Sequence, residues 1–288
     1  MRWLIAGCGD LGLLVAAAVR AQGATVWGLR RHIEKLPDWL PSLRADLATG
    51  EGLDRLPAID VVLYTASADR YSDEAYRAAY VDGPRHLIDA LERRQHPGSR
   101  PRWLHVSSTS VYAQSDGSWV DEDSPTRPAS FGGQRLLEGE VLLRGRPDSV
   151  VLRLAGLYGP GRARLVDRIR SGEARRLAPP VHTNRIHLAD AARALVHLAT
   201  LSAPERLYLG VDDAPVLDGE VKTWLADRLG VANPPIAGAS PTSRAMRSNK
   251  RCSNRRLRAS GFRFRFPDYR SGYESLLVAR EKSNRDPS

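Results

Sequence analysis

Cysteine is scarce in this sequence, which has only Cys8 and Cys252 among its 288 residues. The two are far apart, and no cluster of histidines and cysteines accompanies either, so neither a disulfide framework nor a zinc site is expected. Long apolar runs are lacking as well, and none could span a bilayer. The N-terminal residues lead into a glycine turn with no cleavage site, so no signal peptide is expected. We expect a cytoplasmic protein with no bound metal and no membrane partner.

Lysine is also rare, with four lysines against 39 arginines, and the formal net charge is +10. From Pro241 onward, thirteen basic residues face four acidic ones, a difference of +9 that contains nearly all of the imbalance. The arginine excess is explained by codon bias or by a basic patch that attracts phosphate-bearing ligands. Nucleic acid is a further alternative, but no helix-turn-helix, zinc finger or aromatic RNA-binding motif accompanies the charge. We expect a small-molecule substrate and no nucleic-acid partner.

The composition is otherwise that of a soluble globular protein, with 42% hydrophobic and 26% charged residues. Short apolar segments alternate with longer helical patterns, which predicts a parallel sheet with crossover helices. The predicted strands cover residues 3–6, 25–29, 61–65, 103–107, 150–154 and 208–211. The predicted helices cover residues 11–21, 74–94, 133–144, 189–201 and 219–229. The alternating segment FRFRF, residues 262–266, predicts a half-buried strand.

These elements predict an α/β protein, a Rossmann-type doubly wound parallel sheet with a small C-terminal substrate lobe. We expect residues 1–160 plus 186–211 to form the nucleotide-binding core. Residues 161–185 plus 212–288 are expected to form the substrate lobe.

A glycine-rich turn, GCGDLG, follows the first predicted strand and opens the first predicted helix. Its first glycine permits a tight turn, its second lets the backbone approach a pyrophosphate, and its third lets the helix pack on the strand. The N-terminus of the helix offers free N–H groups and a positive dipole end to phosphates. The turn therefore predicts a dinucleotide site that includes Gly7, Gly9, Asp10, Leu11 and Gly12.

The end of the second predicted strand, TVWGLRR, bears on which dinucleotide is bound. An NAD site places an acidic residue there for the ribose hydroxyls. This sequence has Arg30 and Arg31 instead, and its first carboxylate is Glu34. Two arginines suit a 2′-phosphate, although they are also explained as solvated surface charges. NADP is therefore expected in preference to NAD.

Further motifs, in order along the chain, resemble the extended short-chain dehydrogenase/reductase superfamily, also called NAD-dependent epimerase/dehydratase-like proteins. They are ADL at 45–47, YTAS at 64–67, YVDG at 80–83, HVSSTSVY with WVDEDSPTRP, and VLRLAGLYGPGR with NRIHLADAA. The resemblance implies a homodimer formed through the helices at about 75–94 and 133–144. It also implies cofactor contacts at Asp46, Leu47, Thr65, Ala66, Ser67, Ser107, Leu154 and Leu157, and substrate contacts at Thr109, Gly156, Asn184 and Arg185.

One departure from the family pattern concerns the proton donor. Relatives carry Tyr-x-x-x-Lys after the acidic loop, where the lysine lowers the phenol's pKa and the phenol exchanges a proton with the substrate. Here Phe131 occupies the tyrosine place and Arg135 the lysine place. Phenylalanine carries no exchangeable proton, whereas arginine could still hold the nicotinamide ribose. The resemblance is thus to an atypical branch of the superfamily.

The remaining candidates for chemistry are few. Ser108 stands at the family's catalytic serine, where it would hydrogen-bond the reacting oxygen, but it could equally cap the end of its strand. Tyr112 is expected to pack in the core, and His187 to order the fold. Arg185 is a candidate to replace the diphosphate-binding arginine that epimerase relatives have at the place of Thr183.

Two hypotheses about function follow from the resemblance. The first is an NAD(P)-binding oxidoreductase or epimerase that acts on a small hydroxyl, carbonyl or sugar-like substrate, using Ser108 with a substitute proton donor. The second is a catalytically degenerate NADP-binding regulatory or scaffold protein, because Phe131 replaces the usual tyrosine. The intact binding motifs favour the enzyme.

Overall fold

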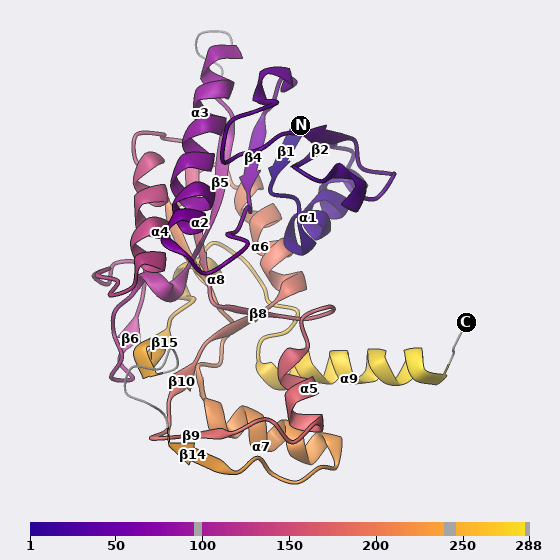
Figure 1. Ribbon diagram of the computed structural model, residues 1–288, viewed down its shortest axis with the longest axis vertical. Coiled ribbons are helices and arrows are strands. Elements are labelled where there is room, and N and C mark those ends of the chain that lie inside the picture. Colours follow the sequence, from indigo (N-terminus) through magenta and orange to yellow (C-terminus); the bar gives the residue numbers. More distant parts are fainter. Residues whose placement is uncertain (95–99, 239–245, 286–288) are drawn as a thin grey trace. The chain divides into compact units, whose positions relative to one another are not determined.

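A computed structural model of the chain describes residues 1–94, 100–238 and 246–285 (Figure 1). The chain forms two compact units. The first comprises residues 1–111, 127–153 and 192–208. The described residues of the second fall within 112–126, 154–191 and 209–285. The assignment of a separate lobe to substrate binding stays a prediction.

A seven-stranded sheet has the order β12-β7-β5-β4-β1-β2-β3. The pairs β1–β2, β1–β4, β2–β3 and β4–β5 are all parallel. Because the chain builds outward from β1 in one direction and from β4 in the other, the switch point lies between these two strands. The predicted Rossmann-type α/β fold is confirmed. The strands are β1 (Arg2–Ala6), β2 (Thr25–Arg30), β3 (Ser42–Arg44), β4 (Val61–Tyr64), β5 (Arg102–Ser108), β7 (Ser149–Leu154) and β12 (Leu207–Gly210).

The helices of the first unit cover this sheet. Helix α1 packs against β1 and β2, while α4 packs against β5 and its neighbouring helix α3 (Figure 1). Short 3-10 turns form the connections η1 (Ile33–Lys35), η2 (Leu53–Arg55) and η4 (Thr109–Val111). The helices are α1 (Asp10–Ala21), α2 (Asp73–Arg77), the π-helical segment η3 (Ala78–Asp82), α3 (Gly83–Arg94), α4 (Phe131–Leu142) and α6 (Leu188–Thr200), the last of which begins in the second unit.

The π-helical segment η3 interrupts the helix that the sequence predicted over 74–94. A π turn displaces backbone carbonyls from regular helical bonding. The Tyr64 hydroxyl donates to the carbonyl of Ala79 at 2.6 Å, and the carbonyl of Tyr80 lies against Gly139 of α4, where a Cβ would stand 2.1 Å from it. Gly139 thus lets α4 approach η3 closely.

The core of the first unit lies on the central strands. All four residues of β4 are buried, as expected of a parallel strand that is covered on both faces. Leu4, Leu29, Val62, Tyr64 and Trp103 belong to one apolar cluster on this sheet.

The second unit is built from short strands and helices. Its strands form the pairs β8–β11, β10–β13, β9–β14 and β6–β15, and its apolar core includes Val166, Leu225 and Tyr273. The strands are β6 (Trp119–Val120), β8 (Gly156–Tyr158), β9 (Arg176–Ala178), β10 (His182–Thr183), β11 (Arg185–His187), β13 (Val216–Leu217), β14 (Ile236–Gly238) and β15 (Arg251–Cys252). The helices are α5 (Arg164–Arg170), α7 (Asp218–Leu229), η5 (Met246–Ser248), α8 (Arg255–Ala259) and α9 (Tyr269–Arg285).

The strand predicted at 262–266 is wrong. The segment is irregular, although its side chains alternate in burial as the pattern indicated. The backbone N–H groups of Arg265 and Phe266 donate to the carboxylate of Asp190 at 2.9 and 2.7 Å. A side chain therefore takes the donors that a neighbouring strand would have bonded.

Two features of the described ranges bear on the chemistry available. No helix within them is long and apolar enough to cross a membrane, and no group of three or more His, Cys, Asp or Glu is placed there to hold a metal ion.

Cys8 and Cys252 are buried free thiols. Burial raises the pKa of Cys8 to about 11 and that of Cys252 to about 12, so neither is a reactive thiolate near neutral pH.

Candidate functional site

The glycine turn follows β1 at the switch point, and its outer glycines are fixed by close packing. Gly7 has a φ of +78°, and a Cβ there would stand 2.3 Å from the Cα of Ala66. A Cβ on Gly12 would stand 2.9 Å from the side chain of Ile5 in β1. The first glycine therefore makes the turn and the third brings α1 against its strand, the two roles that the spacing predicted.

The middle glycine differs, because space in front of it is open. A Cβ on Gly9 would meet only the carbonyl oxygen of Gly7, at 3.9 Å. Gly9 is the N-cap of α1, and no side chain caps that terminus. The backbone N–H groups at the start of α1 and the positive end of the helix dipole can therefore face an anion here. This is a cradle that a side chain would fill and a pyrophosphate fits.

A cavity of about 480 Å³ adjoins this turn, within the first unit. Its walls come from the loops after β1, β2, β3 and β4 and from the start of the helical segment α2–η3. Predicted cofactor residues that line it are Gly7, Gly9, Arg30, Arg31, Asp46, Leu47, Ala66 and Ser67. Lining residues that the sequence did not single out include His32, Asp69, Arg70 and Glu74.

Packing and hydrogen bonds fix further predicted cofactor residues in and around the cavity. Asp10 and Leu11 open α1, and Leu11 is buried. The Thr65 hydroxyl donates to the carbonyl of Gly7 at 3.0 Å, which ties the end of β4 to the turn. The Asp46 carboxylate accepts the N–H of Ala48 at 2.8 Å.

One end of the cavity is rich in arginine. Arg30 donates to the carbonyl of Cys8 at 3.3 Å, and Arg31 lies 3.7 Å from the carboxylate of Asp69. The first carboxylate after β2, that of Glu34, is 3.2 Å from His32 and 3.6 Å from Arg44. His32 and Arg44 engage Glu34, which does not line the cavity. The guanidinium groups of Arg30 and Arg31 match phosphate oxygens in charge and geometry.

A buried ionic network lies beneath the serine strand β5. The Ser107 hydroxyl donates to Oε1 of Glu140 at 2.6 Å. Arg153 donates to both oxygens of the same carboxylate, from Nε at 2.9 Å and from Nη2 at 2.6 Å. The side chain of Ser107 thus holds α4 to the sheet, and its contact with a cofactor stays a prediction.

The residues after Ser107 form a capped strand end. The Ser108 hydroxyl accepts the N–H of Ser110 at 3.1 Å, which is the capping geometry that the sequence left open. Ser108 is nevertheless half-buried rather than enclosed, whereas Thr109 is buried. The hydroxyl of Ser108 can still reach a ligand.

Helix α4 directs Phe131 and Arg135, the residues predicted to replace the family's Tyr and Lys, toward α2 and its neighbours. The Phe131 ring lies 4.6 Å from that of Tyr71 and 5.5 Å from that of Tyr76, between ring centroids. Arg135 donates to both oxygens of Asp73 at 2.8 Å and to Glu138. These carboxylates engage the Nε, Nη1 and Nη2 donors of Arg135, so this residue joins α4 to α2.

Two glycines at the start of α4 lie close to neighbouring segments, Gly133 to the turn after β5 and Gly132 to α2. A Cβ on Gly133 would stand 3.0 Å from the carbonyl oxygen of Ser110 and 2.4 Å from Pro128. A Cβ on Gly132 would stand 2.9 Å from the ring of Tyr76. No larger side chain fits at either position without movement of its neighbours.

In the second unit, strand pairing brings together three of the predicted substrate residues. Gly156 of β8 pairs with Arg185 of β11, and its N–H donates to the carbonyl of Asn184 at 3.3 Å. The Asn184 amide donates to the carbonyl of Lys250 and accepts the N–H of Cys252, at 2.9 and 2.8 Å. These contacts give Asn184 a structural task, and its role toward substrate stays a prediction. Leu154 is buried at the end of β7 and Leu157 is half-buried in β8.

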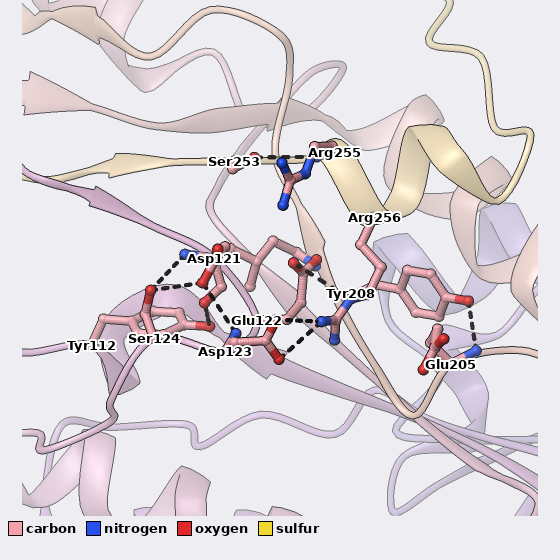
Figure 2. Close-up of polar contacts among 11 residues, drawn as sticks. Tyr112, Asp121, Glu122, Asp123, Ser124, Glu205, Tyr208, Ser253, Arg255 and Arg256 are labelled. Atoms are coloured by element: carbon pink, nitrogen blue, oxygen red, sulfur yellow. Dashed lines mark hydrogen bonds and ion pairs between the residues drawn. The ribbon is translucent and has the colours of Figure 1, made fainter.

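The basic C-terminal segment is held by acidic partners within the second unit. Arg256 contacts Asp123 at 2.8 Å and Glu122 at 3.8 Å (Figure 2). Arg258 lies 3.1 Å from Asp213. These ion pairs give the segment a structural role.

The same acidic loop holds Tyr112 in place. The Tyr112 hydroxyl donates to the carbonyl of Asp121 at 2.7 Å, and the Asp121 side chain in turn contacts Ser124 (Figure 2). The residue is 2% exposed. Tyr112 packs as the sequence predicted.

A buried polar cluster surrounds Arg185. Its Nη2 donates to Thr183 at 2.5 Å, and its guanidinium lies 5.6 Å from the ring centre of Tyr269. Among the described residues, Nη1 of Arg185, Oδ2 of Asp212 and the Tyr269 hydroxyl are buried without a hydrogen-bond partner. Burial raises the pKa of Asp212 to about 7, against the lowering influence of Arg185.

We expect Asp212→Asn to remove a pH-dependent loss of stability. Because the folded-state pKa is raised, the contribution of Asp212 is fully favourable below the unfolded value near 4. It is lost as the pH rises through about 7. Between pH 5.5 and 7.5, the wild type should lose about 2 kcal/mol relative to Asp212→Asn. Urea unfolding at both pH values measures this difference, and parallel pH profiles would contradict it.

Comparison with known proteins identifies a family and several proteins that are similar to this chain. The model of the NAD dependent epimerase/dehydratase family matches residues 3–210. A solved Methylobacillus flagellatus protein, assigned to the NAD-dependent epimerases/dehydratases, is 38% identical with a TM-score of 0.81, and the match covers 97% of this chain and 98% of that one. The structure of MoeE5 in complex with UDP-glucuronic acid and NAD is 25% identical with a TM-score of 0.80, over 98% of this chain and 99% of that one.

A curated relative matches a shorter part. Protein YeeZ of Escherichia coli K12 is 34% identical over 172 residues, which are 55% of this chain and 59% of that protein. The match thus spans less than two thirds of that relative.

Proposed function

The chain belongs to the NAD-dependent epimerase/dehydratase family, and from this membership we propose that it is an NADP-dependent oxidoreductase or epimerase. Its substrate would carry a hydroxyl or carbonyl group on a small or sugar-like molecule. The observation that carries the proposal is the cavity of the first unit, which has the Gly9 cradle in one wall and Arg30 and Arg31 in another. MoeE5, solved with a sugar nucleotide and NAD, supports the sugar-like class.

The residues that would hold the dinucleotide follow from their chemistry. The backbone at Gly9 and the first turn of α1 would bind the pyrophosphate, and Arg30 with Arg31 would bind the 2′-phosphate. Asp46 and Leu47 lie in the wall expected to receive the adenine. The nicotinamide, when bound, supplies the hydride acceptor or donor.

Ser108 would act on the substrate rather than on the cofactor. Its half-buried hydroxyl would donate a hydrogen bond to the reacting oxygen and stabilise the charge that develops there. The Tyr112 hydroxyl already donates to Asp121, so water is the better-supported source of the proton.

Titration calorimetry with NADPH and NADH tests the cofactor assignment. We expect NADPH to bind more tightly, and Arg30→Ala with Arg31→Ala to weaken NADPH by roughly 100-fold, because charge-assisted hydrogen bonds contribute about 1.5–3 kcal/mol each. NADH binding should change little. If neither dinucleotide binds the wild type, the glycine turn is not a cofactor site.

A cofactor-binding protein without turnover is the second candidate, favoured by the arrangement at the start of α4. Phe131 contacts aromatic rings and Arg135 is engaged by Asp73 and Glu138. Steady NADPH oxidation with any of a panel of aldehydes, ketones or keto sugars would exclude this candidate. If Ser108→Ala then left turnover unchanged, the role of Ser108 would be excluded as well.

A further inference from the structure

The loop after β4 carries two charges that the cofactor assignment has not used. Asp69 and Arg70 line the same cavity as Arg30 and Arg31, and both are exposed. They follow the motif YTAS at 64–67, which contains the predicted cofactor residues of this loop. Their position makes them candidates to contact whatever Arg31 binds.

Asp69 is the ion-pair partner of Arg31. Nη2 of Arg31 lies 3.7 Å from Oδ2 of Asp69, with the side chains 55% and 64% exposed. The pair joins the end of β2 to the loop after β4, and both residues line the cavity. An ion pair this exposed contributes little to stability, so a stronger anion can displace the carboxylate at small cost.

Arg70 differs from the other arginines of the cavity. Arg30 donates to the carbonyl of Cys8, and Arg31 has Asp69. Within the part of the chain that the structure describes, Arg70 has no hydrogen-bond or ion-pair partner. Its guanidinium therefore has donors uncommitted beside the cavity, in a geometry that matches phosphate oxygens.

We propose that Arg70 joins Arg31 in binding the 2′-phosphate of NADP and that Asp69 competes with this phosphate for Arg31. The inference rests on the proposed function. The phosphate carries up to two negative charges, so it must both displace the carboxylate and approach it. The neutral 2′-hydroxyl of NADH neither has to displace the Asp69 carboxylate from Arg31 nor is repelled by it. Asp69 therefore lowers the preference for NADPH over NADH that the arginines alone would give.

Calorimetric titration of Asp69→Asn with NADPH and NADH tests the competition. We expect NADPH to bind roughly three- to tenfold more tightly than to the wild type, with NADH changed by less than twofold. Asp54→Asn is the matched control, because Asp54 also pairs with an exposed arginine, Arg55 at 3.9 Å, but does not line the cavity. It should leave both affinities unchanged.

Arg70→Ala tests the second half of the proposal. NADPH binding should weaken by about tenfold and NADH binding should not, whereas Arg55→Ala should affect neither. A melting curve for each variant shows whether the fold is intact, which we expect for residues this exposed.

A double-mutant cycle identifies the route by which Asp69 acts. In an Arg31→Ala background, the gain from Asp69→Asn should be smaller, because only the direct repulsion between carboxylate and phosphate is left to relieve. Unchanged or weaker NADPH binding by Asp69→Asn would overturn the inference, as would the same gain with and without Arg31. Failure of the wild type to bind either dinucleotide would instead overturn the proposed function. Loss of NADPH binding in Arg30→Ala/Arg31→Ala, with no effect of Asp69→Asn or Arg70→Ala, would overturn this inference alone.

Discussion

Replacing Gly9 by alanine will weaken the binding of both NADPH and NADH by about 30- to 100-fold while the first unit stays folded. The methyl group would enter the open space where the pyrophosphate must approach the backbone. It meets no protein atom closer than 3.9 Å, and the φ of −99° at Gly9 is open to any residue. Stability should fall by at most about 1 kcal/mol, the cost of alanine at an N-cap.

Two other glycines serve as controls for this result. Gly7→Ala should lose binding together with stability, because its φ is +78° and its Cβ would overlap the backbone of Ala66. Gly145→Ala should change neither, since a Cβ there meets nothing within 4 Å. Calorimetric titration with a melting curve separates the three. If Gly9→Ala bound dinucleotides as the wild type does, the pyrophosphate would not lie on this turn.

The central sheet was predictable because its signals are local. Each buried strand is a short apolar run, and each crossover helix has its own periodicity, so both can be recognised without knowing their neighbours. The glycine turn is equally local, and the structure confirms the packing roles of Gly7 and Gly12. The edge strand at Ser42–Arg44 was missed, because three residues with one half-buried side chain carry no such signal.

The cavity residues that follow β4 could not be predicted from local signals in the same way. Asp69, Arg70 and Glu74 come to the site from the loop after β4 and from α2, and nothing in their own spacing indicates a ligand. Their relevance arises only because strand pairing places β4 beside β1. Comparable reasoning applies to Asn184, whose amide partners lie more than sixty residues later.

The start of α4 shows that a sequence motif does not by itself identify which side chains face the candidate site. Matching to the family pattern selected Phe131 and Arg135, whose side chains contact α2 residues and their neighbours. Successive residues of a helix differ by about 100° in direction, so Gly133, two positions from each of them, points elsewhere. Gly133 faces the carbonyl of Ser110, in the turn after β5. Packing, which the sequence does not display, decides which residue meets Ser110.

The largest loss of stability is expected from Glu140→Ala. The Glu140 and Arg153 side chains are only 10% and 6% exposed, and they form a two-point ion pair. Removing one partner leaves a buried guanidinium without its carboxylate, which typically costs about 3–5 kcal/mol. The Ser107 hydroxyl loses its acceptor as well. Urea unfolding, with hydrogen exchange of β5 and α4 as a local reading, measures the loss.

Two variants separate burial of charge from the loss of a side chain. Glu138→Ala, on the same helix, removes an exposed carboxylate that pairs with Arg135 and should cost less than about 1 kcal/mol. Replacing the buried pair together, with Glu140→Leu and Arg153→Met, should recover most of the stability, because it removes the desolvated charge rather than isolating it. If Glu140→Ala cost no more than Glu138→Ala, the network would not be what holds α4 to the sheet. If the double variant were as unstable as Glu140→Ala, the shape of the two side chains rather than their charge would be responsible.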